Sequence, residues 1–203
     1  IVVSDEIHYD LTKPGTEYIP FASVDDTCRD ISVTCIAPTK TFNLAGLQTA
    51  AVYAENSILH HRMWRQLNTD EVAEPNAFAI QATIAAFQYG EEWLDELREY
   101  VEKNKQYVTE FLQEKIPLIH PVAGDATYLM WLDCRKITES GRQFAKFIRK
   151  TSGLYVSGGN QYGKGGEGFL RVNVATSKLV VEDGMQRLYE SVDAWLKEEK
   201  ISK

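Results

Sequence analysis

Cysteine is scarce in this sequence, and the little that is present argues against several classes of protein. The 203 residues include three cysteines, Cys28, Cys35 and Cys134, and no two of them form a Cys-x-x-Cys pair. An odd number of scattered cysteines fits neither a disulfide framework nor a structural zinc site. We therefore expect a reduced, cytoplasmic protein without a metal centre.

Positive charge and long apolar runs are lacking as well. Lys and Arg number 22 against 29 Asp and Glu, so the formal net charge is −7, which disfavours general binding to a phosphate backbone. No apolar run approaches the ~18 residues that a membrane span needs. The sequence thus predicts a protein that binds neither nucleic acid nor membrane.

The chain does have the composition of a folded protein. Hydrophobic residues make up 44% and charged residues 25%, which suits one large or two small domains with apolar cores. The sequence opens Ile1-Val2-Val3 with no initiator Met and no signal peptide. Three β-branched residues in a row are typical of the interior of a strand. We therefore expect a fragment of a longer chain.

Hydrophobic periodicity predicts an α/β fold in two parts. Strands are predicted at residues 1–8, 31–36, 50–54, 118–119, 128–132, 154–156 and 169–174, and helices at 56–68, 76–89, 91–115, 139–152 and 177–199. The pattern changes after the long third helix, so we expect a domain boundary near 90–115. One domain would occupy residues 1–90, and a linking helix with a second domain would occupy 91–203.

The most distinctive segment is Ala37-Pro38-Thr39-Lys40-Thr41-Phe42-Asn43-Leu44-Ala45-Gly46-Leu47-Gln48. It places Lys40 directly after a predicted buried strand, in a turn rich in small residues. A lysine shielded from water there could act as a nucleophilic amine or form a Schiff base with a carbonyl compound. A solvated turn lysine explains the same spacing, so the spacing alone leaves both interpretations open.

Polar side chains also follow the first predicted strand. Asp5 and His8 lie in the segment Val3-Ser4-Asp5-Glu6-Ile7-His8. Open α/β sheets bind ligands beyond the carboxyl ends of their strands, which favours a functional role for both residues. They could also be two metal ligands, but no third partner has suitable spacing. A polar transition from strand to loop is the remaining interpretation.

A glycine string precedes the last predicted strand. The segment Gly163-Lys164-Gly165-Gly166-Glu167-Gly168 satisfies G-x-G-x-x-G, but a strand follows it, and no helix N-terminus is available to hold a pyrophosphate. We therefore reject a dinucleotide site and expect a flexible, hairpin-like loop. Arg171 in that strand needs an anionic partner, which could be an internal carboxylate or the carboxylate of a ligand.

Taken together, these segments resemble the fold-type I, pyridoxal 5'-phosphate (PLP)-dependent aminotransferase family (class I/II), and most closely its MalY/PatB-type cystathionine β-lyase (C–S lyase) branch. The resemblance is carried by residues 4–11, 39–48, 126–133 and 168–173 in that order. It implies the C-terminal half of that α/β fold, with part of the large mixed-sheet domain in 1–90 and the complete small α+β domain after the linking helix. It also implies a homodimer in the intact enzyme.

The resemblance assigns a role to each candidate residue. Lys40 would bind PLP covalently and later move the Cα proton of an amino-acid substrate, and Asp5 would pair with the pyridine nitrogen. His8 would lie near the 3-oxygen of the cofactor, and Thr39 would serve its phosphate. Arg171 would bind the α-carboxylate of the substrate through a bidentate fork.

Two positions depart from the aminotransferase pattern. Transaminases of the family commonly carry a serine three residues before the lysine and an arginine eight after it, where this chain has Ala37 and Gln48. Gln48 resembles the lyase branch. We therefore expect a PLP-dependent C–S β-lyase of amino-acid metabolism that releases thiol, pyruvate and ammonia from L-cystathionine or other L-cysteine conjugates. An aminotransferase and a catalytically incomplete fragment are the alternatives.

Overall fold

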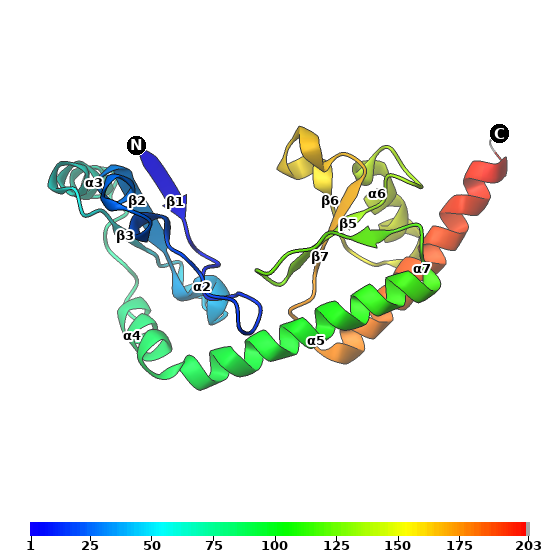
Figure 1. Cartoon of the computed structure of the whole chain (residues 1–203), viewed down its shortest axis with the longest axis horizontal. Helices are drawn as coiled ribbons and strands as arrows, with labels where there is room; N and C mark the ends of the chain where they lie inside the picture. The colour runs from blue at the N-terminus through cyan, green and yellow to red at the C-terminus, as the bar shows by residue number, and fades with distance from the viewer. Residues whose placement is uncertain (202–203) are drawn as a thin grey trace. The chain divides into compact units, whose positions relative to one another are not determined.

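The chain divides into two units, Ile1–Arg98 and Glu99–Lys203, in a computed structural model that describes the backbone of residues 1–201 and the side chains of residues 1–198. The division falls inside the long helix α5 (Glu91–Lys115), which begins in the first unit and ends in the second (Figure 1). None of the helices described combines the length and the apolar character that a bilayer crossing needs.

A three-stranded sheet in the order β1-β2-β3 forms the basis of the first unit. β1 (Val2–Asp5) runs parallel to β2 (Ser32–Ile36), and β3 (Ala51–Tyr53) runs antiparallel to β2. Two parallel neighbours need a crossover, because the chain must return to the same end of the sheet. Here the crossover contains η1 (Phe21–Ser23) and α1 (Asp26–Ile31).

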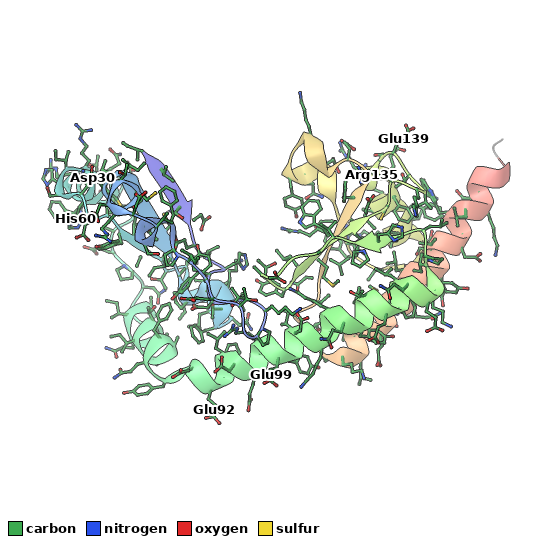
Figure 2. All side chains as sticks on the ribbon, in the orientation of Figure 1. Asp30, His60, Glu92, Glu99, Arg135 and Glu139 are labelled. Carbon is green, nitrogen blue, oxygen red and sulfur yellow. The ribbon has the colours of Figure 1, made fainter. Side chains whose placement is uncertain are left out.

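Helical segments make up most of the remaining first unit. They are α2 (Pro38–Thr41), η2 (Ala45–Leu47), α3 (Ser57–Thr69) and α4 (Ala79–Tyr89). α3 begins where the Asn56 side chain accepts hydrogen bonds from the backbone N–H groups of Ile58 and Leu59, as expected of an N-cap. Along α5, Glu92 and Glu99 project from the exposed side of the helix (Figure 2), consistent with its amphipathic sequence.

An antiparallel sheet in the order β4-β5-β7-β6 is the centre of the second unit. Its strands are β4 (His120–Pro121), β5 (Leu129–Asp133), β6 (Ser157–Gly158) and β7 (Phe169–Asn173). Its helices beyond α5 are α6 (Gly141–Ser152), η3 (Gly159–Tyr162), η4 (Lys164–Gly166) and α7 (Lys178–Ile201). Leu132 and Leu170 lie opposite each other on β5 and β7 and are fully buried, so this strand pair forms part of the core.

Two predicted strands are wrong, and the other predicted strands and helices are confirmed with shifts at their ends. The pairing predicted for residues 118–119 occurs two residues later, at His120–Pro121, which lie opposite Asp133 and Leu132. Residues 154–156 form no strand, and pairing with β7 begins at Ser157. Apolar runs predict burial, but the choice of a strand partner depends on residues far away in the sequence.

Two leucines of α7 give a matched test of this core. Leu188 has no exposed surface, whereas Leu179 is 77% exposed on the same helix. We expect Leu188→Ala to lower the free energy of unfolding by about 2–5 kcal/mol, because it removes a packed side chain and leaves a cavity. Leu179→Ala should change it by less than about 0.5 kcal/mol. Urea denaturation of both variants measures the difference, and equal effects would contradict the packing described.

Candidate active site

Asp5 and Lys40 come from the carboxyl ends of two neighbouring parallel strands. Asp5 is the last residue of β1 and lies opposite Cys35 of β2, and Lys40 follows Cys35 by five residues. Because β1 and β2 run in the same direction, both polar side chains emerge at one edge of the sheet. Both are exposed, and Asp5 Oδ1 accepts a hydrogen bond of 3.3 Å from the Ile7 backbone N–H.

Lys40 itself is carried by a well-anchored helix. Its neighbours Thr39 and Thr41 are buried, while Lys40 is exposed. The Thr41 hydroxyl donates to Asp10 Oδ2 at 3.5 Å, and the ring of Phe42 packs edge-on against Phe87 with centroids 5.6 Å apart. Side chains on both sides of the lysine therefore anchor α2, and the lysine itself is exposed.

His8 lies in the turn that follows β1. It is partly buried, and its carbonyl oxygen accepts a 3.0 Å hydrogen bond from the Leu11 N–H. Burial is the main cause that raises the pKa of Tyr9 to about 12, and it also raises the pKa of Asp10. In the part of the chain that the structure describes, no three His, Cys, Asp or Glu side chains are grouped as metal ligands.

A cleft beside α2 brings together the two positions at which the sequence departs from the aminotransferase pattern. It has a volume of about 330 Å³, and Ala37 and Gln48 both line it. Gln48 has a φ of 48°, in the left-handed region, at the end of η2. Glu74 and Thr83 add polar groups, and Ile80 adds apolar surface. The cleft therefore has polar and apolar walls next to the helix that carries Lys40.

Arg171 lies in β7 of the second unit. Among the described residues of that unit, no carboxylate forms an ion pair with it. Instead, its guanidinium carbon lies 4.0 Å from the centroid of the Tyr162 ring. The structure thus places Asp5, His8, Thr39 and Lys40 in the first unit and Arg171 in the second, where no described carboxylate of that unit forms a salt bridge with it.

The sequence did not reveal two of these interactions. The bond between Thr41 and Asp10 joins residues 31 positions apart, and no local pattern predicts such a pair. The stacking of Tyr162 on Arg171 had a weak signal, since an aromatic residue directly precedes the glycine string ahead of the arginine strand. Both interactions depend on the tertiary structure.

Comparison with known protein families identifies the architecture. The family model described as aminotransferase class I and II matches residues 1–188. This chain belongs to that family. The family includes mixed α/β proteins that bind PLP, which agrees with the fold class predicted from the sequence.

Individual members of the family point to one branch. The chain is 41% identical to cystathionine beta-lyase PatB of Bacillus subtilis over 187 residues, which cover 92% of this chain and 48% of PatB. It is 30% identical to protein MalY of Escherichia coli, over 95% of this chain and 49% of MalY.

A solved structure is also similar to this chain, over about the same share of its length. Cystalysin from Treponema denticola, whose crystal structure contains a pyridoxal 5'-phosphate cofactor, superimposes with a TM-score of 0.91 at 28% identity, over 96% of this chain and 49% of cystalysin. The chain therefore spans about half the length of the family members that it matches.

Proposed function

We propose that this chain is part of a PLP-dependent C–S β-lyase that acts on L-cystathionine or other L-cysteine conjugates. The observation that carries the proposal is the placement of Asp5 and Lys40 at the carboxyl edge of one parallel strand pair, in a chain 41% identical to a cystathionine beta-lyase. The residues of the first unit would form part of the cofactor site, and Arg171 of the second unit would bind substrate.

The residues at this edge suit the chemistry of PLP. An exposed primary amine can react with the aldehyde of the cofactor, and an exposed carboxylate can pair with a protonated pyridine nitrogen. Thr39 has a hydroxyl next to the lysine in the sequence, and Gln48 offers an amide to the adjacent cleft, from which it could donate to a phosphate. His8 would lie near the 3-oxygen. The donor set therefore fits this cofactor.

PLP, when bound, supplies a sink for the electrons left behind when the Cα–H bond of an amino acid breaks. Lys40 Nζ would take the proton from Cα, and the Asp5 carboxylate would keep a proton on the pyridine nitrogen. The Arg171 guanidinium would hold the α-carboxylate, which orients the Cα–H bond toward the base. These three roles account for α-proton removal, after which a thiolate at Cβ can leave.

The test of this proposal is a product assay on the PLP-loaded enzyme. With L-cystathionine as substrate we expect equal amounts of thiol and pyruvate. Conversion of the cofactor to its pyridoxamine form, with no thiol released, would support an aminotransferase instead. Absence of both products, with no visible absorbance band on addition of PLP, would support a catalytically incomplete fragment.

Arg171 gives a prediction about substrate binding. Arg171→Leu should raise the KM for L-cystathionine about 100-fold, because two charge-assisted hydrogen bonds to the α-carboxylate are lost. Arg149 is a matched control, since its guanidinium also stacks on an aromatic ring, that of Tyr155, at 4.8 Å. Arg149→Leu should leave KM unchanged, and equal effects of the two substitutions would count against a carboxylate site at Arg171.

The remaining proposals concern the whole protein. We propose a cytoplasmic homodimer that works in amino-acid metabolism, with residues 1–90 belonging to the large PLP-binding domain and 91–203 to the linking helix and the small domain. Exposed apolar side chains on α4, among them Ile80, Ile84 and Phe87, support association with another surface. Sedimentation of the PLP-loaded enzyme tests the dimer, and a monomer at micromolar concentration would contradict it.

A further inference from the structure

The glycine string ahead of β7 has a structural role that a nucleotide motif does not explain. The string contains η4, and the four residues before it form η3; these two short turns pack against each other between the antiparallel strands β6 and β7. A methyl group added at Gly166 would overlap the carbonyl oxygen of Gly159, and one added at Gly159 would overlap that of Gly166. Gly163 joins the turns with a φ of 115°, which side chains rarely adopt.

This close contact fixes the position of Tyr162, the last residue of η3. The Tyr162 ring meets Trp131 edge-on, with centroids 5.5 Å apart, and Trp131 packs edge-on against Phe169 at 6.1 Å. Trp131 and Arg171 lie opposite each other on β5 and β7. These contacts keep the Tyr162 ring over Arg171, although Tyr162 is itself 44% exposed.

The contact between Tyr162 and Arg171 is made with the face of the tyrosine ring. The guanidinium carbon lies 4.0 Å from the centroid of the ring, and a cation in that position is attracted to the face of the ring. A carboxylate, in contrast, binds to the N–H groups of a guanidinium. Among the described residues of the second unit no carboxylate pairs with Arg171, and the Tyr162 ring is an aromatic group over which its guanidinium lies.

We propose that the two glycine turns place the Tyr162 ring on Arg171, and that this stacking orients the guanidinium fork for the α-carboxylate of the substrate. Tyr162 is thus a positioning residue. The inference rests on the proposed function, because it takes Arg171 as the carboxylate site. It also explains the glycines at 159 and 166, since larger residues there would separate the turns and displace the ring.

Substitutions at Tyr162 separate a role of the ring from a role of the hydroxyl. In the PLP-loaded enzyme, Tyr162→Leu should raise the KM for L-cystathionine about tenfold and change kcat by less than about twofold, as expected from the loss of a cation–π contact. Tyr162→Phe keeps the ring and should restore the KM. A KM unchanged by Tyr162→Leu, or a Phe variant as impaired as the Leu variant, would overturn the proposal.

Substitutions in the two turns test whether their close contact positions the Tyr162 ring. Gly166→Ala should raise KM as Tyr162→Leu does, because its methyl group forces the turns apart. Gly165→Ala is the matched control, since a methyl group there meets no atom within 4 Å. The Gly165 variant should keep the KM of the parent, and a Gly166 variant that also keeps it would show that the close contact is not needed.

A readout that does not depend on turnover distinguishes failure of this inference from failure of the proposed function. The Nε–Hε resonance of Arg171, observed by NMR in nitrogen-labelled protein, should carry a ring-current shift that is lost in Tyr162→Leu and kept in Tyr162→Phe. Titration with propionate should move this resonance, and the Leu variant should need about tenfold more propionate. If no thiol or pyruvate forms, the proposed function fails, while equal propionate affinities overturn the inference.

Discussion

Lys40→Ala is expected to lower kcat for β-elimination by at least about 10³-fold and to abolish the visible absorbance band that PLP gives with the parent enzyme. The substitution removes both the amine that binds the aldehyde and the base that takes the Cα proton, and general-base catalysis alone contributes about 10²–10⁴-fold. Lys40 is exposed on an anchored helix, so its removal should leave the fold intact. Stopped-flow absorbance and a pyruvate assay measure the two effects.

Two controls make the loss specific to this amine. Lys146 is an exposed lysine of α6, and Lys146→Ala should keep both the band and the activity. Added methylamine should restore part of the activity of the Lys40 variant, because a small free amine can occupy the space of the missing side chain. A Lys40→Ala enzyme that retains a tenth of the parent kcat would contradict the proposed role.

Asp5→Asn should lower kcat by about 10²–10³-fold, the usual effect of removing one group that stabilises charge in the transition state. The amide has nearly the shape of the carboxylate but no negative charge, so it cannot hold a proton on the pyridine nitrogen. Covalent attachment through Lys40 does not depend on that charge, and PLP should still bind. The expected result is therefore a coloured enzyme with low turnover, measured by the same absorbance and product assays.

The control for Asp5 is another exposed aspartate. Asp125 lies in the loop before β5, and Asp125→Asn should leave turnover and absorbance at their parent values. Loss of colour together with activity in Asp5→Asn would mean that the carboxylate is needed for binding of the cofactor. Turnover within a factor of about three of the parent would contradict a role in catalysis.

Local patterns in the sequence were sufficient to predict most of the fold. The helix predicted at 91–115 matches α5, since its apolar residues recur at helical spacing over many turns. The end of the helix predicted at 139–152 is confirmed, since α6 ends at Ser152 and Gly153 caps it with a φ of 75°. The strands at 118–119 and 154–156 were wrong, because short apolar runs do not specify a partner.

The candidate site shows the same division between local and distant information. The segment around Lys40 was recognisable by residue type and spacing, and the structure shows its surroundings: buried threonines, the bond from Thr41 to Asp10, and Phe42 packed on Phe87. The roles of Lys40, Asp5, His8, Thr39 and Arg171 stay predictions. For Arg171, the sequence allowed a salt bridge or a ligand, and the structure offers the ring of Tyr162.

The sequence by itself determined the α/β class, the order of the elements, and the segments that resemble the aminotransferase family, because these depend on residue types and on periodicities within a single helix or strand. Only the tertiary structure decided that Asp5 and Lys40 share one edge of a sheet, since that follows from the parallel pairing of two strands with 26 residues between them. It also decided that Tyr162 lies on Arg171, because two glycine turns pack where no side chain would fit. Such contacts join residues of different elements, and their geometry is settled by packing.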